Sequence, residues 1–260
     1  MGTKIWNINS RFFITKIVKK CTFLYSLAME STPLQKGTLH PLTLVTAEIV
    51  RIFGKQGFSV VTGPELEDEY HNFDALNVPK DHPARDMQDT FFIKDRPGYV
   101  LRTHTSPVQI RYMETHKAPF AIIVPGKVFR NESTDATHEM QFHQVEGLVV
   151  GEGITVEHLK GTLLGFFKEL FGEGTEIRLR PSFFPFVEPG FEVDVKVGEK
   201  WLEVCGAGMV HPNVFKSVGY DGEKVTGFAF GMGLDRLANV KFGFPDIRLA
   251  YQGDLRFNQF

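Results

Sequence analysis

Apolar residues recur at helical spacing in some segments of this chain and at strand spacing in others. From residue 38 to residue 57 an apolar residue recurs every three or four positions, which predicts a helix with one buried face. Thr38 would cap this helix, Pro41 would stand in its first turn and Gly57 at its end. Between 191 and 197 apolar and charged residues alternate, which predicts a half-buried antiparallel strand. The same reasoning predicts strands at 58–61, 99–103, 120–124, 127–129, 142–150, 201–205 and 225–230, and helices that begin at Ser106 and cover 155–171 and 233–240.

The order of these elements indicates the fold class. Strands that follow one another through short turns, such as the turn predicted at Pro125-Gly126, pair in antiparallel fashion, and the few helices flank them. We therefore expect an α+β catalytic domain from residue 38 to residue 260, built on an antiparallel β-sheet flanked by helices. The polar segment from Glu65 to Met87, interrupted by prolines, predicts a long surface loop.

Charge separates residues 1–37 from the rest. They carry six basic residues and one acid, Glu30, so this segment has a charge of +5 and the remaining chain −7 out of a total of −2. We expect a basic, poorly ordered extension, with Met29 as a candidate start, and a cleaved targeting peptide is the alternative. No uncharged run reaches the roughly 18 residues of a membrane helix.

The whole chain excludes few classes of function. A net charge of −2 gives no overall attraction to a polyanion, so contact with nucleic acid would need a local patch or a partner chain. Cys21 and Cys205 lie far apart in unlike contexts, which argues against a disulfide framework and fits a reducing compartment.

Ionisable residues concentrate in VFRNESTDATHEMQFHQVEG, residues 128–147, which predicts a strand, a polar loop and a returning strand. Arg130 and Glu132, two residues apart, share one face, and an arginine held on a strand offers a fixed fork for a phosphate. Phe142, Gln144 and Glu146 share a face of the returning strand. An aromatic ring, an amide and a carboxylate there could hold a base, a polar group and an ammonium. The alternative is a charged hairpin whose side chains only pair with one another.

A second motif, GFAFGMGLDRLA at residues 227–238, predicts a strand that enters a glycine turn and then a helix. Gly231, Gly233 and Arg236 are spaced G-x-G-x-x-R. A dinucleotide-binding turn would need a third glycine and an early parallel unit, so the pattern does not fit that class. Glycines permit close approach of the backbone, and an arginine in the first helical turn can reach a phosphate.

Together these motifs resemble motifs two and three of the class II aminoacyl-tRNA synthetases, and the helix and strand from Thr38 to Pro64 resemble motif one, the dimer element. The closer resemblance is to the alpha subunits of bacterial phenylalanyl-tRNA synthetases. It runs from about His40 to Phe260 through ordered strings: HPLTL, NFDALNVPKDHPARDM, LRTHTSPVQIRYM, VFRNESTDATHEMQFHQVEGLVVGEG, FFPFVEPG, GAGMVHP, TGFAFGMGLDRLA and PDIR.

The resemblance implies roles for individual residues. At the amino-acid site it implies His104, Ser106 and Gln109, and it assigns the ammonium of phenylalanine to Glu132, Gln144 and Glu146. Toward ATP it implies that Arg130 and His138 address the α-phosphate, that Phe142 stacks on adenine, and that Arg236 takes the distal phosphates, with Glu132, Gly231 and Gly233 beside the nucleotide. Without the resemblance, Ser106 would be a helix cap and the two histidines of the hairpin, His138 and His143, surface or core residues.

The string FFPFVEPG resembles the specificity element of the family. Phe184 and Phe186 would present ring edges to the phenyl group of the substrate, a geometry worth on the order of 1 kcal/mol per pair beyond burial. Val187 would line the same pocket, and Ala229 would leave room for the ring at its floor. Composition alone would place the phenylalanines in the core.

The resemblance also implies a magnesium ion. Glu188 matches the family's ligand, described there as shared with the beta subunit, and Glu203 is a weaker candidate. Mg²⁺ prefers a few carboxylates together with substrate phosphates, so a sparse protein shell is expected. The alternative for both residues is surface ion pairing.

The implied function is activation of phenylalanine with ATP to phenylalanyl-adenylate and transfer to tRNA(Phe), by a cytoplasmic α2β2 enzyme. No protein nucleophile is required, and rejection of tyrosine by an apolar pocket would be modest, so editing is expected on the beta subunit. The family's N-terminal helical arm, which contacts tRNA, has no counterpart before His40. The alternatives are therefore a truncated or synthetase-like adenylating protein that does not charge tRNA, and a non-catalytic module that binds an amino acid or a protein.

Overall fold

The structure is a computed structural model, and it describes residues 37–85, 89–136 and 138–258. Residues Leu39–Phe260 form one compact unit. The predicted basic extension, apart from Gly37, and Cys21 lie outside the described residues. Within the described part of the chain, no helix is both long and apolar enough to cross a membrane.

A seven-stranded sheet forms the centre of the molecule, in the order β1-β4-β5-β9-β8-β7-β6, and β2 pairs with β3 in a second sheet. Every neighbouring pair is antiparallel except β1 with β4. This confirms the predicted antiparallel α+β fold. The strands are β1 (Ser59–Val60), β2 (Leu66–Asp68), β3 (Tyr99–Leu101), β4 (Phe120–Phe129), β5 (Gln141–Gly151), β6 (Ile177–Phe184), β7 (Val187–Val197), β8 (Lys200–Val210) and β9 (Thr226–Gly233).

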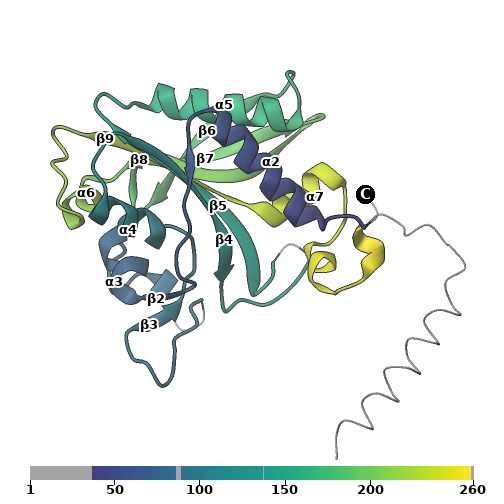
Figure 1. The fold of residues 1–260 in the computed structure, drawn as a ribbon, viewed down its shortest axis with the longest axis horizontal. Helices are drawn as coiled ribbons and strands as arrows, with labels where there is room; N and C mark the ends of the chain where they lie inside the picture. The colour runs from purple at the N-terminus through teal and green to yellow at the C-terminus, as the bar shows by residue number, and fades with distance from the viewer. Residues whose placement is uncertain (1–36, 86–88, 137, 259–260) are drawn as a thin grey trace, which may run out of the picture. The chain divides into compact units, whose positions relative to one another are not determined.

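Helices cover both faces of the large sheet (Figure 1). The helices are α2 (Pro41–Lys55), α3 (Glu69–Asn72), α4 (Pro107–Thr115), α5 (Val156–Phe171), α6 (Pro212–Ser217) and α7 (Leu234–Phe242), with short 3₁₀ turns η1 (Asp74–Leu76), η2 (Pro83–Arg85), η3 (Ile247–Tyr251) and η4 (Leu255–Asn258). One core joins α2, α5 and α7 to one face, and a second core joins α4, α6 and η1 to the other. Strand alternation sends Ile123 into the first core and Ile122 into the second.

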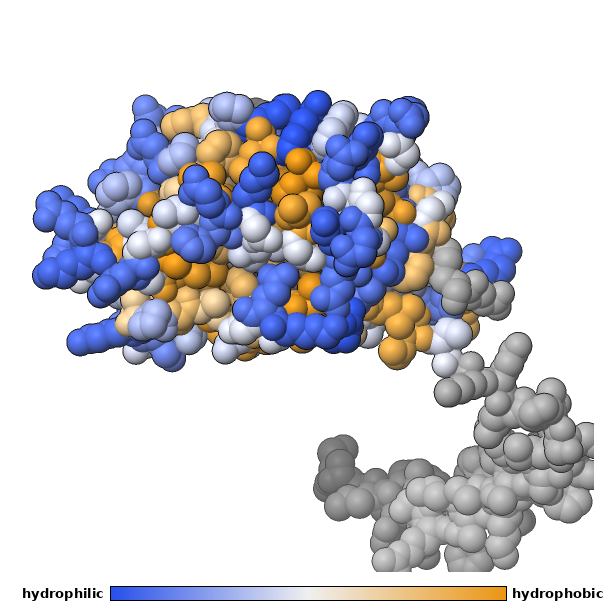
Figure 2. Space-filling model, turned by 90° about the horizontal axis from the view of Figure 1, so that it is seen from above, coloured by the Kyte–Doolittle hydropathy of each residue, from blue (hydrophilic) through white to orange (hydrophobic). Residues whose placement is uncertain are grey.

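Charged and apolar residues are mixed on the surface seen from above the view of Figure 1, where α5 lies (Figure 2). Arg51 and Lys55 of α2 each lie 2.6 Å from Glu169 of α5, so ion pairs join the two helices outside their apolar contact. Exposed pairs of this kind contribute little stability, and burial of apolar side chains holds the helices in place.

The predicted turn at Pro125-Gly126 is wrong. β4 runs unbroken through both residues, with Pro125 opposite Val145 and Gly126 opposite Gln144. On its other side β4 pairs with β1 only at Ile122 and Ile123, so the missing N–H of proline falls where β1 offers no ladder hydrogen bond. The two short strands predicted at 120–124 and 127–129 are therefore one strand, which carries the chain to Arg130.

The long surface loop predicted from Glu65 to Met87 is also wrong. Its described part forms β2, α3, η1 and η2, and it buries Phe73, Leu76 and Val78 in the second core. Its polar residues have structural partners: Asp68 caps α3 and Asn72 donates to Thr103. These elements have only three or four residues each, too few to show a hydrophobic period.

Other predicted boundaries shift by a few residues. His40, not Thr38, caps α2, and its Nδ1 accepts the N–H of Leu42 at 3.2 Å. The predicted helix at 155–171 is confirmed, with Thr155 as its N-cap and Gly172 as its C-cap. The glycine turn expected at Gly231 is absent, because β9 continues through it to Gly233. β6 and α6 had no clear signal in the sequence.

Candidate active site

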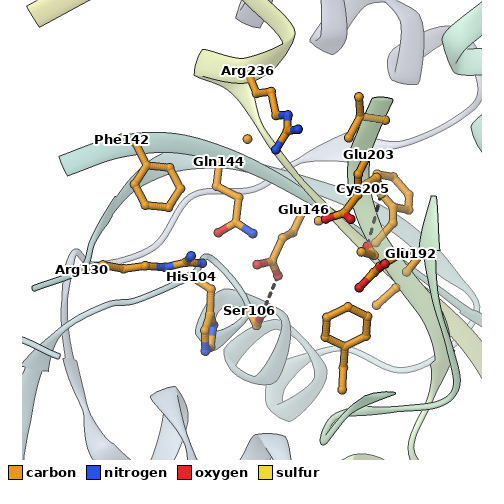
Figure 3. Close-up of a pocket in the computed structure, with 18 of the residues that line it drawn as sticks. His104, Ser106, Arg130, Phe142, Gln144, Glu146, Glu192, Glu203, Cys205 and Arg236 are labelled. Atoms are coloured by element: carbon orange, nitrogen blue, oxygen red, sulfur yellow. Dashed lines mark hydrogen bonds between the residues drawn. The ribbon is translucent and has the colours of Figure 1, made fainter. Parts of the chain in front are cut away.

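A cavity of about 760 Å³ opens on the sheet face that carries α4 (Figure 3). Its lining draws on β5, β7, β8 and β9, the start of α4, the start of α7, and the loop that follows β4. It brings together sixteen residues that sequence reasoning proposed: His104, Ser106, Gln109, Arg130, Glu132, His138, Phe142, Gln144, Glu146, Phe184, Phe186, Val187, Ala229, Gly231, Gly233 and Arg236. Of the proposed residues, Glu188 alone lies outside this lining.

Glu146 on β5 is a cavity carboxylate that is almost completely buried, with 4% of its surface exposed. Its Oε2 accepts hydrogen bonds from Ser106 Oγ at 2.6 Å and Gln109 Nε2 at 2.7 Å, and its Oε1 accepts the N–H of Thr105 at 3.2 Å. Burial raises the pKa of Glu146 to about 7, although these hydrogen bonds and Arg102 act in the opposite direction. A cationic group that entered here would find a preformed, desolvated carboxylate.

Ser106 stands at the N-cap position of α4, yet its side chain makes no capping hydrogen bond. The hydroxyl turns to Glu146 instead. Gln109, one turn further along the helix, points the same way and is also buried. The capping interpretation of Ser106 is therefore wrong, and the start of α4 serves to hold the carboxylate of β5.

Arg130 follows β4, and its Nε donates to the carbonyl of Thr103 at 3.2 Å. Its guanidinium carbon lies 5.0 Å from the ring centre of Phe142 on the neighbouring strand. Burial lowers the pKa of Arg130, which Glu132 and Glu146 partly offset. Among the described residues no carboxylate lies within ion-pair distance of it, so its remaining donors face the cavity.

Arg236 lies in the first turn of α7 and is exposed. Figure 3 shows it reaching toward the cavity from the side opposite Arg130, with Gln144 between them. In the described part of the chain Arg236 also lacks an ion-pair partner. Two guanidinium groups, far apart in sequence, therefore line one cavity, and within the described part of the chain neither forms an ion pair with a carboxylate, which suits a polyanionic ligand.

Apolar residues form the other end of the cavity. The rings of Phe184 and Phe186 lie 6.0 Å apart at an angle of 25°, and His104 lies 6.2 Å from Phe186. Val187 and Ala229 complete this part of the lining. Phe184 rests close to the backbone of β8, since a Cβ added to Gly206 would lie 3.1 Å from its ring.

Two buried polar atoms of residues that line the cavity, His104 Nδ1 and Gln144 Oε1, have no hydrogen-bond partner among the described residues. Burial lowers the pKa of His104 to about 3, and the charges of Arg130 and Arg102 act in the same direction, so the ring is neutral. Buried polar atoms are normally bonded. Both residues line the cavity, and a ligand bound against them would supply the missing partners.

The carboxylates proposed for metal lie in different places. Glu188 is 75% exposed, borders a separate groove, and lies 3.3 Å from His211 Nε2. Glu203 and Glu192 line the main cavity, although Arg180 pairs with both, at 3.2 Å and 2.8 Å.

His138, which the sequence predicted beside the α-phosphate, lies at the exposed rim of the cavity, with its Nδ1 3.0 Å from Asp135.

Sequence reasoning missed several residues of the cavity. Ala207 and Cys205 of β8 line it from the sheet, Glu192 lies beside them on β7, and Asp235 precedes Arg236 in α7. Asp235 and Ala207 carried a signal, since they stand inside the strings GFAFGMGLDRLA and GAGMVHP. Glu192 carried none, because its place depends on the register of β7 with β8.

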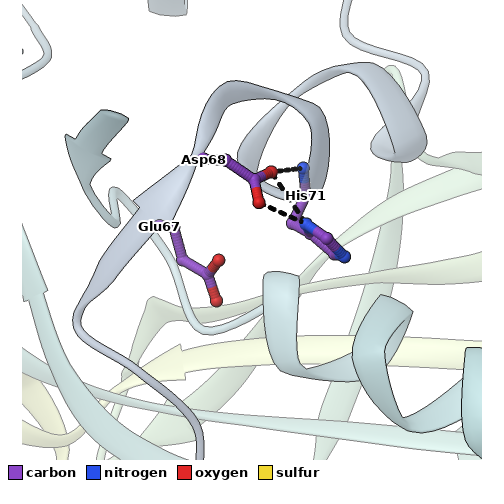
Figure 4. Close-up of side chains that lie close together, drawn as sticks. All are labelled: Glu67, Asp68 and His71. Atoms are coloured by element: carbon purple, nitrogen blue, oxygen red, sulfur yellow. Dashed lines mark hydrogen bonds and ion pairs between the residues drawn. The ribbon is translucent and has the colours of Figure 1, made fainter. Parts of the chain in front are cut away.

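Outside the cavity, Glu67, Asp68 and His71 bring possible ligand atoms within 4.8 Å of one another (Figure 4). Arg111 already provides a cation there, with its Nη2 2.6 Å from Glu67 and 3.5 Å from Asp68. His71 in turn bonds to Asp68 at 2.7 Å. We interpret the cluster as a partly buried ion network that joins β2, α3 and α4.

Comparison with known proteins identifies the family. The model of the tRNA synthetases class II core domain (F) matches residues 25–260. The phenylalanine--tRNA ligase alpha subunit of Dehalococcoides mccartyi is 54% identical over 249 residues, which cover 89% of this chain and 72% of that protein. The corresponding subunit of Anoxybacillus flavithermus is 52% identical over 247 residues, 90% of this chain and 71% of that protein.

Among solved structures, pyrrolysyl-tRNA synthetase from Desulfitobacterium hafniense aligns with a TM-score of 0.66 over 97% of this chain and 87% of that one. At 16% identity this likeness shows the fold alone. The fold, the family model and the relatives agree. This chain belongs to the phenylalanine--tRNA ligase alpha-subunit family of class II aminoacyl-tRNA synthetases.

Proposed function

We propose that the chain activates phenylalanine with ATP and transfers the phenylalanyl group to tRNA(Phe), as the catalytic alpha subunit of an enzyme completed by a beta subunit. The observation that carries the proposal is one cavity with three kinds of lining: a desolvated carboxylate, an aromatic end and two unpaired guanidinium groups. An amino acid and a triphosphate together need all three.

The amino acid would bind at Glu146. Its ammonium would take the place prepared by Glu146 and Gln144, and the ring would extend between Phe184 and Phe186 toward Ala229. The unpartnered Nδ1 of His104 and Oε1 of Gln144 would gain hydrogen bonds to this substrate. The aromatic end offers only apolar contacts, so discrimination against tyrosine within it would be modest.

ATP would lie across the sheet from Phe142 to Arg236. The adenine would stack on Phe142, Arg130 would hold the α-phosphate, and Arg236 would hold the distal phosphates, with His138 and Glu132 at the rim. A carboxylate oxygen of phenylalanine attacks the α-phosphorus, and the bond from that phosphorus to the bridging oxygen breaks, so that pyrophosphate leaves. Positioning of both substrates and neutralisation of charge by the two arginines supply the catalysis.

Mg²⁺ would neutralise phosphate charge in the same cavity. Glu203 and Glu192 would be its carboxylate ligands, in exchange for their ion pairs with Arg180 at 3.2 Å and 2.8 Å, because a small number of carboxylates completed by phosphates is what Mg²⁺ prefers. Glu188 is exposed outside the cavity, so it would bind a metal ion only if a second chain, such as the beta subunit, supplied the other ligands.

Phenylalanine-dependent exchange of pyrophosphate into ATP tests the proposal. The chain is purified with the beta subunit of the same organism and assayed for exchange and for charging of tRNA(Phe). We expect both activities, and we expect Arg130→Gln to lower exchange by about two orders of magnitude, as for loss of a charge-stabilising donor. Exchange without charging would support the adenylating alternative, which the relatives do not favour. No exchange with any amino acid would exclude the proposal.

A further inference from the structure

Asp235 lies beside Arg236 and is bound from two other elements. It is a cavity residue in the first turn of α7 with only 3% of its surface exposed. Its Oδ1 accepts the hydroxyl of Tyr251, in η3, at 2.5 Å, and its Oδ2 accepts the backbone N–H of His143, in β5, at 2.7 Å. Hydrogen bonds to a carboxylate are roughly twice as strong as those between neutral groups.

Tyr251 also contacts His143 directly. His143 Nδ1 lies 3.0 Å from the Tyr251 hydroxyl, and the two rings are nearly parallel, at 10° and 6.2 Å. Since the hydroxyl has one proton and gives it to Asp235, it accepts the proton of His143 Nδ1. The three residues therefore form a closed ring of hydrogen bonds: His143 donates from its backbone N–H to Asp235 and from Nδ1 to Tyr251, and Tyr251 donates to Asp235.

The segment that carries Tyr251 is itself held on two sides. His40 Nδ1 accepts from Leu42, so its Nε2 carries the proton, and this Nε2 donates to the carbonyl of Ala250 at 3.0 Å. The N–H of Ile247 donates to the carbonyl of Ala136, in the loop after β4, at 3.1 Å. Tyr251 therefore approaches α7 from a segment that is already fixed.

This network connects the two elements that would hold ATP. On β5, His143 stands between Phe142 and Gln144, so the bond from its backbone N–H to Asp235 ties the strand that carries Phe142 to the helix that carries Arg236. An acidic residue in the first turn of a helix also stabilises that helix through its dipole. Stabilisation of the helix dipole by Asp235 does not depend on its buried hydrogen bonds to Tyr251 and His143, so these bonds need another explanation.

We propose that Asp235 and Tyr251 are positioning residues that fix α7 against β5 and so set the spacing between Arg236 and Phe142 for ATP. This inference rests on the proposed function. It assigns to the C-terminal segment a part in nucleotide binding, although Tyr251 itself is not among the residues that line the cavity. Loss of the Tyr251 hydroxyl should weaken binding of ATP much more than binding of phenylalanine. Glu146 also lies on β5, but Ser106 and Gln109 at the start of α4 hold its carboxylate, and Tyr251 does not.

Tyr251→Phe tests the inference, because it removes the donor and keeps the ring against His143. The matched control is Tyr220→Phe, which removes a hydroxyl bonded to the carbonyl of His116, away from the cavity. Both variants are prepared with the beta subunit. Michaelis constants for ATP and phenylalanine come from pyrophosphate exchange, dissociation constants from calorimetry, and unfolding temperatures are measured in parallel.

We expect Tyr251→Phe to raise KM and Kd for ATP about tenfold, the effect of losing one hydrogen bond to a charged group, with the values for phenylalanine within about twofold. Asp235→Asn should show the same selective loss, and Tyr220→Phe should show none. Equal changes for both substrates, or no change with Tyr251→Phe, would overturn the inference even if the wild-type enzyme is active. An inactive wild-type enzyme would instead refute the proposed function.

Discussion

Glu146 combines two properties that seldom occur together in one residue: it is ionisable and nearly excluded from water. Sequence reasoning placed it on one face with Phe142 and Gln144, because side chains of a strand alternate. It could not show the burial, since Ser106 and Gln109 approach from a helix about forty residues away along the chain. Burial raises the pKa of Glu146, and the hydrogen bond from Ser106 acts in the opposite direction.

This pKa predicts how the affinity for phenylalanine depends on pH. Because burial raises the pKa of Glu146 to about 7, the carboxylate loses its charge as the pH falls through neutrality, while the ammonium of the substrate keeps its own. We expect kcat/KM for phenylalanine to fall about tenfold from about pH 8 to about pH 6, with KM for ATP much less affected. Pyrophosphate exchange at a series of pH values measures both.

Glu146→Gln is the control for that profile, and it should raise KM for phenylalanine and abolish the step near pH 7. Glu67→Gln is a matched variant, because Glu67 is equally buried but pairs with Arg111 outside the cavity. It should keep the wild-type profile. A step that survives in Glu146→Gln would show that another group titrates.

At the scale of elements, β9 brings the parts of the site together through its glycines. Gly231 lies opposite Glu146 on one side and Gly206 on the other. A Cβ added there would lie 2.9 Å from Gln144 Nε2 and 3.1 Å from Glu146 Cγ. Sequence reasoning assigned this glycine to a phosphate-binding turn. The structure places it in a strand beside the residues proposed for the ammonium.

Gly231→Ala is therefore expected to impair the amino-acid site. The new methyl group must move the amide end of Gln144 and shift Glu146 by a few tenths of an ångström. Because a misplacement of about 1 Å costs on the order of a hundredfold in rate, we predict a smaller loss, about tenfold, in kcat/KM for phenylalanine. Gly161→Ala on α5, where an added Cβ has no neighbour within 4 Å, is the control: it should keep full activity and raise the free energy of unfolding by about 0.5–1 kcal/mol. Equal activity of the two variants would contradict the assignment.

At the scale of the whole molecule, patterns that recur along the chain were predictable and contacts between distant segments were not. The spacing of apolar residues along the chain predicted the antiparallel sheet and the helices α2 and α5. It failed at Pro125, because a proline is tolerated inside β4 only where the neighbouring strand β1 has already ended. It also failed in the segment from Glu65, because Phe73 and Leu76 are buried in elements too short to show a period.

The candidate site follows the same division. Arg130 and Arg236 were predicted from motifs that carry their own geometry, and the structure brings both into one cavity. Glu192 and Tyr251 depend on strand register and on the path of the C-terminal segment, which no local pattern records. Glu188 matched a motif but lies outside the cavity, so its role stays a prediction.

A crystal structure of the chain and its beta subunit with a non-hydrolysable phenylalanyl-adenylate analogue tests the central claim most directly. We predict the ammonium within hydrogen-bond distance of Glu146, the phenyl ring between Phe184 and Phe186, and the phosphate-mimicking group within reach of Arg130. An analogue bound elsewhere, or one whose phosphate mimic makes no contact with Arg130 while its ammonium lies away from Glu146, would contradict the account.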